Sequence, residues 1–261
     1  MHPLNPSHLQ RFKDKVVIVT GAASGIGEAT ARRFSDEGAR VLLADRNAAA
    51  LTKVFDSLPS ERTAARETDV SRHEDVREMV AFAIERFGRL DVLVSDAGIF
   101  AEGNVTEVSP EDWHRVQATN VNGVFYGARE AMPHLQKTRG CIVNVASVSG
   151  LGADWNLSAY NTSKGAVVNL TRAMAMDFGR KGVRVNSVCP SFTHTAMTAD
   201  MEDDPVLQEK FAERIPLGRG AEAQEIAAVI TFLASPDAAF VTGVNMPVDG
   251  GLTASNGQPP Q

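Results

Sequence analysis

Cysteine is scarce in this chain of 261 residues, which contains Cys141 and Cys189 alone. Each lies inside an apolar run, so we expect no disulfide framework and a reducing, cytoplasmic location. No stretch of about 18 consecutive apolar residues occurs, which predicts no membrane-spanning helix. Residues 1–15 are polar and lack the apolar core of a secretory signal, so none is predicted there.

Metal-ligand spacing and an excess of basic charge are also missing. The six histidines are scattered, and no His-x-x-x-His or Cys-x-x-Cys pair occurs, so no metal site is predicted. The formal net charge is −6, which argues against a dominant basic surface for nucleic acid. The hydrophobic fraction of 43% and the charged fraction of 22% are typical of a globular protein.

What the chain does have is a regular alternation of short β-branched runs and longer helical segments. Strands are expected at Val16–Val19, Val41–Ala44, Ala64–Arg66, Asp91–Val94, Cys141–Val145, Val183–Val188 and Asn245–Val248. Helices are expected at Gly25–Phe34, Ala48–Leu58, Glu74–Phe87, Asp112–Leu135, Ala159–Phe178 and Glu222–Leu233. Pro133 should end or kink the fourth helix near its carboxyl end.

Strands separated by helices indicate βαβ units, and right-handed crossovers then wind the sheet in both directions. The predicted fold class is therefore α/β: a single doubly wound Rossmann-type domain over residues 12–254, with a mostly seven-stranded parallel sheet and helices on both faces. Segments 1–11 and 255–261 are predicted to be flexible tails. Segment 195–217 contains an acidic cluster at 200–204 and is predicted to be a mobile helical insertion over the site.

The segment Thr20–Gly27 lies between the first predicted strand and the first helix. Its glycines at 21, 25 and 27 form a G-x-x-x-G-x-G variant of the dinucleotide fingerprint. Glycine lets the backbone approach a pyrophosphate, and the helix start directs amide groups and dipole at the phosphate charge. We predict cofactor contacts here, and a purely structural loop is the alternative. The predicted contacts are Gly21, Ser24, Gly25, Ile26 and Gly27.

The second predicted strand ends at Asp45, and Arg46 follows it. A carboxylate at this point can accept hydrogen bonds from the adenosine ribose and repels a 2′-phosphate. Asp45 therefore favours NAD over NADP, whereas the guanidinium of Arg46 could bind the phosphate of NADP. The structural alternative for Asp45 is a helix N-cap.

Ser147, Tyr160 and Lys164 follow the fifth predicted strand, with Tyr160 and Lys164 on one helix face. A nearby ammonium lowers the pKa of a tyrosine from its reference value of about 10. We therefore predict Tyr160 as a general acid/base, tuned toward neutral pH by Lys164 and by the nicotinamide ring, with Ser147 bonded to the substrate oxygen. The predicted reaction transfers a hydride between a nicotinamide and an alcohol or ketone carbon. A Tyr-x-x-x-Lys pair by itself is more often a half-buried tyrosine above a surface lysine.

Over residues 12–251 the chain resembles the short-chain dehydrogenase/reductase family. The matching pieces are Thr20–Gly27, Thr68–Val70, Ala97–Gly98, Asn120–Val121, Ser147, Tyr160–Lys164, Val185–Ser187 and Val248–Gly251. The resemblance implies that Asp69 and Val70 contact the adenine, that Asn120 holds a water in a proton relay through Lys164, and that Lys164 binds the nicotinamide ribose. It places Thr195 near the carboxamide and phosphates, and it implies a homotetramer. Ala97, Gly98, Pro190 and Thr193 complete the predicted cofactor site, which also includes Tyr160 and Lys164.

Two positions depart from the family pattern. Asn-Asn-Ala-Gly is replaced by Ser95-Asp96-Ala97-Gly98, which bears on cofactor geometry more than on chemistry. Pro-Gly after the sixth strand is replaced by Pro190-Ser191, which puts a side chain where nicotinamide and substrate meet. Neither change removes a predicted catalytic group.

A closer resemblance within the family is carried by Gly140–Trp155, Val167–Met174 and Asn245–Gln258. It implies a small secondary alcohol or vicinal diol and its hydroxyketone, of the 2,3-butanediol and acetoin type. The substrate wall is predicted at Ser149, Leu157, Ser191 and Phe192, which are small or apolar and suit a compact, uncharged alcohol. The structural alternative is that these residues pack their loops.

Two other functions fit the same sequence. One keeps the reaction and changes the substrate to a 3-oxoacyl, sugar or steroid ketone. The other is a non-catalytic, NAD-sensing or scaffold protein, slightly favoured by the altered Ser95-Asp96 motif and opposed by the complete set of catalytic residues. Activity on a thioester ketone marks the first, and NADH binding without turnover marks the second.

Overall fold

The computed structural model describes residues 10–199 and 204–256, in which a parallel sheet is central. Its seven strands have the order β3-β2-β1-β4-β5-β6-β9. Every neighbouring pair is parallel. The strands are β1 (Val16–Thr20), β2 (Arg40–Asp45), β3 (Thr63–Glu67), β4 (Val92–Ser95), β5 (Cys141–Val145), β6 (Arg184–Pro190) and β9 (Asn245–Val248).

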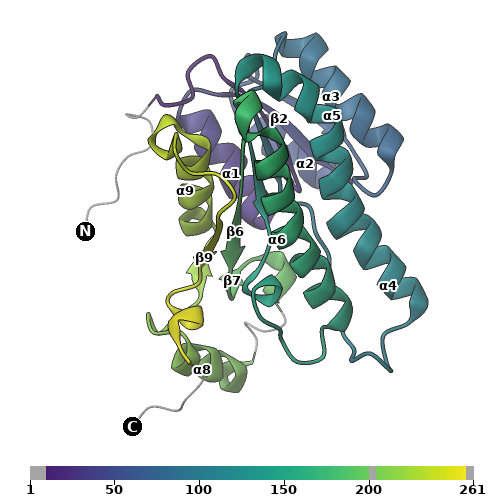
Figure 1. Ribbon diagram of the computed structural model, residues 1–261, viewed down its shortest axis with the longest axis vertical. Helices are drawn as coiled ribbons and strands as arrows, with labels where there is room; N and C mark the ends of the chain where they lie inside the picture. Colours follow the sequence, from purple (N-terminus) through teal and green to yellow (C-terminus); the bar gives the residue numbers. More distant parts are fainter. Residues whose placement is uncertain (1–9, 200–203, 257–261) are drawn as a thin grey trace.

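Helices cover both faces of this sheet (Figure 1). They are α1 (Gly25–Asp36), α2 (Ala48–Asp56), α3 (His73–Phe87), α4 (Pro110–Gln117), α5 (Gly123–Thr138), α6 (Ser158–Phe178), α8 (Pro205–Arg214) and α9 (Ala223–Ala234). On one face α1, α2 and α9 pack against side chains such as Val17, Val19 and Leu43. On the other face α3, α5 and α6 pack against Ile18 and Leu42. The α/β fold with a doubly wound, seven-stranded parallel sheet is thus confirmed.

Neighbouring strand residues alternate between these two hydrophobic layers. Val17 and Val19 belong to one layer, and Val16 and Ile18 to the other. All five residues of β1 are buried. Because both faces of the strand are covered, the sequence reads as a continuous apolar run rather than as an alternating one.

The strand order reverses next to β1, which pairs with β2 on one side and with β4 on the other. From β1 the chain winds outward to β2 and β3, then returns to β4 and winds the other way. The connections above the carboxyl ends of β1 and β4 therefore diverge and leave a crevice. This edge of the sheet positions the functional site.

The predicted fourth helix is divided in the structure. Between α4 and α5 lies a π-helical segment, η2 (Ala118–Asn122), and the hydrogen-bonding pattern widens there for one turn. Single π-turns inside α-helices occur frequently at functional sites. Pro133 does not end the helix, because α5 continues to Thr138 and is capped by Arg139 in the left-handed conformation.

The described part of segment 195–217 contains η5 (Ala196–Thr198) and α8, which lie outside the main sheet, and its mobility stays a prediction. It is flanked by a short parallel pair that the sequence does not predict, β7 (Thr193–His194) and β8 (Ala221–Glu222). In Figure 1, α8 lies at the end of the molecule near the described carboxyl end of the chain. Residues 200–203 of the acidic cluster lie outside the described residues, as do 1–9 and 257–261 of the predicted tails.

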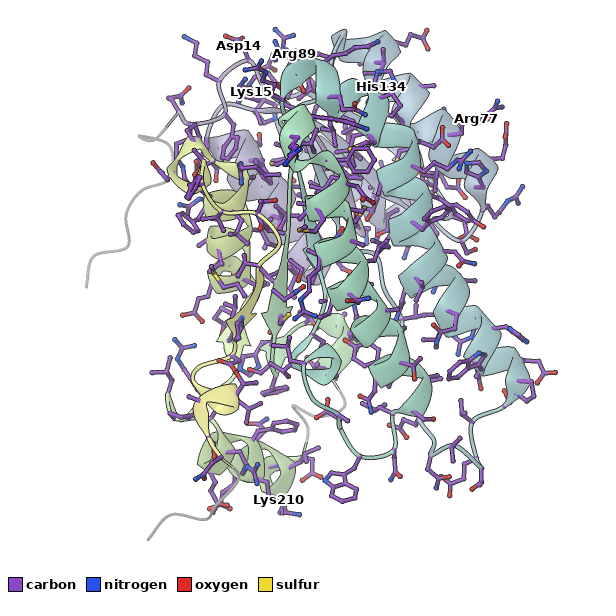
Figure 2. All side chains as sticks on the ribbon, viewed as in Figure 1. Asp14, Lys15, Arg77, Arg89, His134 and Lys210 are labelled. Carbon is purple, nitrogen blue, oxygen red and sulfur yellow. The ribbon has the colours of Figure 1, made fainter. Side chains whose placement is uncertain are left out.

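The opposite end of the sheet carries buried carboxylates held by arginine and lysine. Asp91 accepts hydrogen bonds from the amide of Val16 and from Arg89, and its carboxylate lies 3.3 Å from the Lys15 ammonium. Figure 2 shows Lys15 and Arg89 together at this end, far from Lys210. These contacts fix the amino ends of β1 and β4.

Glu37, the C-cap of α1, is the second buried carboxylate at that end, and its side chain is fully buried. Arg11 donates to it at 2.6 and 2.7 Å, and Arg33 donates at 2.6 Å. Arg11 therefore belongs to the packed domain, and its predicted place in a flexible tail is wrong. Burial acts to raise the pKa of Glu37, but the hydrogen bonds from the two guanidinium groups outweigh it and the pKa lies below its ordinary value.

We predict that Glu37→Gln lowers the free energy of unfolding by about 3 kcal/mol at pH 7, because it leaves two guanidinium groups without their shared anion. Since the folded pKa of Glu37 is lowered, its contribution is present above the unfolded pKa and is lost as pH falls through the folded pKa. Urea denaturation at pH 7 and at pH 3 measures both effects, and the difference between the proteins should shrink at pH 3. Glu85→Gln, an exposed match on α3, should change the stability by less than about 0.5 kcal/mol. Equal stability of Glu37→Gln and native protein at pH 7 would refute the role of this anion.

Candidate active site

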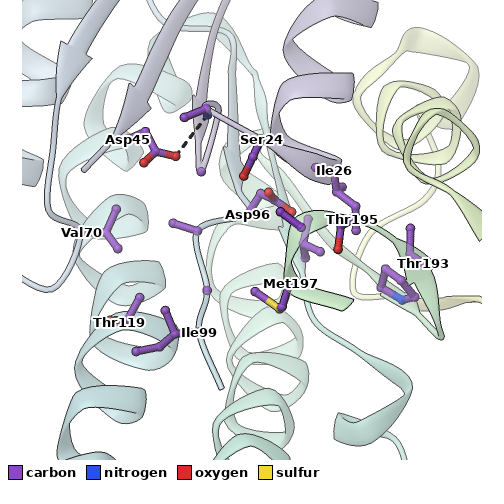
Figure 3. A pocket seen from close by; sticks show the side chains of 18 of the residues that line it. Ser24, Ile26, Asp45, Val70, Asp96, Ile99, Thr119, Thr193, Thr195 and Met197 are labelled. Carbon is purple, nitrogen blue, oxygen red and sulfur yellow. Dashed lines mark hydrogen bonds between the residues drawn. The ribbon is translucent and has the colours of Figure 1, made fainter. Parts of the chain in front are cut away.

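A cavity of about 400 Å³ opens at the carboxyl ends of β1, β2, β4, β5 and β6 (Figure 3). Most of the residues predicted for the site line it together: Gly21, Ser24, Gly25, Ile26, Asp45, Arg46, Asp69, Val70, Ala97, Gly98, Ser147, Tyr160, Lys164, Pro190, Ser191, Thr193 and Thr195. The lining also includes residues outside the sequence prediction, namely Ala23, Asn47, Ala50, Thr68, Asp96, Ile99, Thr119, Val145, Ala146, Ala196, Met197 and Thr198. Several of these directly follow a strand, which is the signal that could have found them.

The glycine loop is shaped for close backbone contact. Gly21 has a φ of +70°, and a Cβ added there would lie 2.9 Å from the amide nitrogen of Ala97. A Cβ at Gly27 would lie 2.1 Å from the carbonyl oxygen of Gly21, so no other residue fits without a shift of backbone. Ser24, the N-cap of α1, makes no side-chain capping bond, so this helix start faces the cavity uncapped. The loop and helix start fit a pyrophosphate group.

Asp45 lies at the end of β2 beside this loop. One carboxylate oxygen accepts from the amide of Ala23 at 3.1 Å, the bond drawn in Figure 3, and the other accepts from the amide of Asn47 at 2.8 Å. The N-cap of α2 is Asn47, whose side chain accepts from Ala50. The alternative role of Asp45 as the N-cap is therefore excluded, and its carboxylate faces the cavity with Arg46.

Asp69 and Val70 line the same end of the cavity, beyond β3. Asp69 accepts hydrogen bonds from the amide and hydroxyl of Ser71 at 2.9 and 2.7 Å, which holds the turn. Val70 packs against Gly123 at the start of α5, where an added Cβ would lie 2.8 Å from its methyl carbon. This contact holds the valine beside the cavity.

Ser147, Tyr160 and Lys164 meet at the other end of the cavity. Lys164 is 5% exposed, and its ammonium donates to the carbonyl oxygen of Val145 at 2.8 Å. The ammonium nitrogen lies 5.6 Å from the ring centroid of Tyr160. Burial lowers the pKa of Lys164 to about 8, against an opposing effect of the Asp96 carboxylate. A lysine with this pKa still carries its charge at neutral pH.

Comparison with known proteins finds oxidoreductases that are similar to this chain. A family model described as enoyl-(acyl carrier protein) reductase matches residues 21–253. A meso-2,3-butanediol dehydrogenase of Serratia marcescens is 55% identical over 249 residues, which cover 95% of this chain and 98% of that protein. The crystal structure of a short-chain dehydrogenase/reductase of the glucose/ribitol dehydrogenase type from Brucella melitensis has a TM-score of 0.89 and 37% identity, covering 93% of this chain and 98% of that one.

A further solved structure is that of a 3-ketoacyl-(acyl-carrier-protein) reductase from Brucella melitensis, complexed with NADH. It has a TM-score of 0.86 and 34% identity, and the match covers 92% of this chain and 99% of that one. The chain belongs to the short-chain dehydrogenase/reductase family. It is therefore an oxidoreductase of the class that uses a nicotinamide cofactor and acts on CH–OH groups, and the glycine loop described above fits that cofactor.

The pKa of Tyr160 in the protein without cofactor lies above its ordinary value, whereas the sequence predicts a pKa nearer to neutral. Burial raises it to about 12, and the negative charges of Asp154 and Asp96 act in the same direction, while a hydrogen bond with Ser147 opposes them. The predicted pKa near neutral, to which the cofactor also contributes, stays a prediction for the cofactor-bound protein. In the protein without cofactor the Lys164 ammonium donates to Val145 rather than to the phenol, and burial has the largest effect on Tyr160.

Asn120 lies in the π-turn and is 1% exposed. Its side-chain oxygen accepts from the amide of Ile99 at 2.9 Å, and its amide donates to the carbonyl of Ile99 and the hydroxyl of Ser163. A Cβ added at Gly98 would lie 3.5 Å from both the Asn120 oxygen and the Lys164 ammonium nitrogen, so these two groups are close. Asn120 thus ties the strand-β4 loop to α6, and its water-relay role stays a prediction.

The predicted substrate wall is only partly assembled. Ser191 lines the cavity. Ser149 is 3% exposed and lies behind Ser147, with its oxygen 2.9 Å from that hydroxyl. Phe192 is buried and stacks on Phe211 of α8. Leu157 pairs with Gly103 in an isolated bridge at the start of α6. For Ser149 and Phe192 these contacts agree with a packing role.

Thr195 approaches the glycine loop from the carboxyl end of β6. Its methyl group lies 3.2 Å from the position of a Cβ added at Gly25. Thr198 donates to the carbonyl of Thr193 at 2.7 Å and so closes this segment into a tight turn. Thr193 and Thr195 line the cavity with Met197, beside Ile26 and Ser24 in Figure 3.

Asp96 is the site residue whose importance the sequence underestimates. Its carboxylate oxygen lies 2.7 Å from the position of a Cβ at Gly27, beneath the glycine loop, and it accepts from the amide of Gly27. Burial raises the pKa of Asp96 to about 7, with Asp45 acting in the same direction and Lys164 opposing it. A group with this pKa changes charge near neutral pH inside the cofactor cavity.

We predict that Asp96→Asn changes the pH dependence of cofactor binding. At pH 6 the protonated acid and the amide are alike, so both proteins should bind NADH with similar affinity. At pH 8 the carboxylate should repel the pyrophosphate, and the variant should bind about fivefold more tightly, the effect of roughly 1 kcal/mol of charge repulsion. NADH fluorescence titrations measure the two dissociation constants. A ratio that does not change between pH 6 and pH 8 would contradict this assignment.

Proposed function

We propose that the protein is an NAD-dependent dehydrogenase of a small secondary alcohol or vicinal diol, of the 2,3-butanediol and acetoin type. The observation that carries this proposal is the meeting of Ser147, Tyr160 and Lys164 at one end of a cavity whose other end presents the glycine loop and Asp45. The 55% identity to a meso-2,3-butanediol dehydrogenase supports the substrate class.

The bound nicotinamide supplies or accepts the hydride. In the direction of reduction Tyr160 gives its proton to the carbonyl oxygen, and its raised pKa keeps that proton on the phenol at neutral pH. Ser147 forms a hydrogen bond with the same substrate oxygen and stabilises the charge that develops there. In the direction of oxidation Tyr160 must first lose its proton, so this direction is favoured at higher pH.

Lys164 places a positive charge within the site and would bind the nicotinamide ribose of the cofactor. Its burial and its bond to Val145 hold the ammonium in one place. A carbonyl oxygen that gains negative charge is stabilised by such a fixed cation in a medium of low dielectric constant. Asn120 contributes by fixing the segment on which Ile99 lines the cavity.

Discrimination between cofactors is assigned to Asp45. Its carboxylate is held by two backbone amides and keeps lone pairs for the ribose hydroxyls. A 2′-phosphate at the same place would bring two anions together. Arg46 lines the cavity beside it and is the group that would favour NADP instead.

We further propose a homotetramer in a reducing, cytoplasmic compartment. On α5 and α6 the side chains of Phe125 and Met176 are 46% and 83% exposed, and assembly through these helices would cover them. Val167 and Met174 are buried within the chain and so do not contribute to such an interface. Cys141 and Cys189 are both free and buried, in keeping with a reducing compartment.

Helices of the described residues include none that is long and apolar enough to cross a membrane. Within the same residues no cluster of three or more potential metal ligands occurs. The proposed reaction uses no metal.

We predict turnover of acetoin with NADH and of meso-2,3-butanediol with NAD, followed by the change in NADH absorbance. The phosphorylated cofactor should be about tenfold less effective, which corresponds to roughly 1.4 kcal/mol of repulsion at Asp45.

Tyr160→Phe should lower kcat about a thousandfold and leave NADH binding intact, because it removes only the proton donor. Tyr126→Phe, which changes the other tyrosine of the chain, should turn over as the native protein does.

Three outcomes would contradict parts of this proposal. Preference for NADP(H) would assign the cofactor choice to Arg46. Reduction of a 3-oxoacyl thioester without reduction of acetoin would favour an acyl reductase, as in the Brucella melitensis neighbour. NADH binding without turnover of any alcohol or ketone would favour a sensor.

A further inference from the structure

A chain of hydrogen bonds leads from the surface to Ser147. The hydroxyl oxygens of Ser147 and Ser149 lie 2.9 Å apart, and the amide of Ser149 donates to the Ser147 oxygen at 3.1 Å. The hydroxyl of Ser149 donates in turn to the carboxylate of Asp154. Both serines are buried, whereas Asp154 lies in the exposed loop between η3 (Val148–Gly150) and α6. This chain is separate from the contacts of Lys164 and Asn120.

The positions of the protons follow from the chemistry of the partners. An ionised carboxylate only accepts hydrogen bonds, so the single proton of the Ser149 hydroxyl points at Asp154. In the protein without substrate the Ser149 oxygen accepts from Ser147, and the single proton of the Ser147 hydroxyl turns to the substrate oxygen when substrate binds, while the amide of Ser149 still donates to the Ser147 oxygen. Asp154 thereby fixes the position of the Ser147 oxygen through Ser149, although it does not touch it.

The backbone of Asp154 is held by Asn161, the residue that follows Tyr160 on α6. The amide of Asp154 donates to the Asn161 side-chain oxygen at 3.2 Å, and the Asn161 side-chain amide donates to the Asp154 carbonyl at 2.8 Å. Asp154 is therefore attached to the helix of Tyr160 by its backbone and to the turn of Ser147 by its side chain. A surface loop with no role would need neither attachment.

The second consequence of the position of Asp154 is that its negative charge acts on Tyr160. The carboxylates that act on Tyr160 are Asp154 from the loop and Asp96 from the segment after β4, and the ammonium of Lys164 on the same helix lies 5.6 Å from the Tyr160 ring centroid. Cys189 at the end of β6 acts on Lys164, but burial raises the pKa of its thiol, so it is neutral. Both carboxylates act to raise the pKa of Tyr160, and only Asp154 lies on the exposed side.

We propose that Asp154 is a positioning residue that fixes the hydroxyl oxygen of Ser147 through Ser149 and holds a negative charge beside Tyr160. The inference rests on the proposed function in so far as Ser147 and Tyr160 act on the substrate. It adds a residue outside the cofactor cavity to the determinants of the reaction, and it links the rate to the protonation of Tyr160.

Three variants separate orientation from charge. Asp154→Asn keeps an oxygen that accepts from Ser149 and removes the charge. Asp154→Ala removes both, and Ser149→Ala breaks the chain while the charge stays. Asp177→Asn, at an exposed position near the end of α6, is the matched control for loss of one negative charge.

With saturating cofactor, Asp154→Asn should move the rising limb of kcat/KM for alcohol oxidation about half a pH unit lower, with kcat nearly unchanged. Ser149→Ala should lower kcat about tenfold and leave the limb in place. Asp154→Ala should shift the limb and also lower kcat about tenfold. The double variant Asp154→Ala/Ser149→Ala should have the same kcat as Asp154→Ala, because both substitutions interrupt the same chain of hydrogen bonds. A purely structural role of Asp154 would not move the limb.

Phenolate absorbance in a Tyr126→Phe background reads the ionisation of Tyr160 without turnover. There too Asp154→Asn should lower the pH of ionisation and Asp177→Asn should not. This absorbance titration needs no substrate, so it gives a result even if the protein turns over none of the substrates tested. Failure of the proposed function is therefore distinguishable from failure of this inference. An unmoved ionisation in Asp154→Asn overturns the charge effect, and multiplied losses in the double variant overturn the hydrogen-bond chain.

Discussion

Parallel pairing of β1 with both β2 and β4 is the constraint on which the rest of the site depends. It brings the carboxyl ends of the strands to one edge and separates the connections that follow them. The close approach of Gly21, Gly27 and Ala97 is possible only at that edge, and it leaves no room for side chains at the glycines. Cofactor contacts and proton chemistry then share one cavity because they come from neighbouring strand ends.

That cavity holds two ionisable groups of opposite charge. Lys164 is buried and Asp96 is half-buried, and burial moves the two pKa values toward neutral. Burial and two carboxylates raise the pKa of Tyr160, although the Lys164 ammonium lies 5.6 Å from its ring centroid. The phenol therefore keeps its proton at neutral pH, which is the protonation state that reduction of a carbonyl requires.

The sequence reveals those parts of the protein that local spacing determines. The strand and helix alternation, the glycine loop and the Tyr160–Lys164 pair all depend on residues close in the chain, and the structure brings them together. The π-turn that holds Asn120 is not visible in the helical periodicity, since one widened turn hardly changes it. The attachment of Arg11 to Glu37 depends on residues 26 positions apart, and polar composition alone does not indicate it.

The charge states of the site depend on burial and on contacts between residues far apart in the chain. The spacing of Tyr160 and Lys164 indicates that they are near each other, but not where the ammonium points or how deeply Lys164 is buried. The roles of Asp96 beneath the glycine loop and of Asp154 behind Ser149 likewise follow from three-dimensional contacts. The sequence marks Asp96 only as a departure from the family pattern, and it does not distinguish Asp154 from an ordinary loop aspartate.

The most direct test of this account is the ionisation of Tyr160 in the cofactor-free protein. In a Tyr126→Phe variant Tyr160 is the single tyrosine, and its phenolate absorbance can be followed as the pH is raised. Since burial raises its pKa to about 12, Tyr160 should remain almost fully protonated at pH 10, where a free tyrosine is about half ionised. Half ionisation at pH 8 or below would show that Lys164 controls the phenol after all, and would contradict the account of Tyr160 as a buried proton donor.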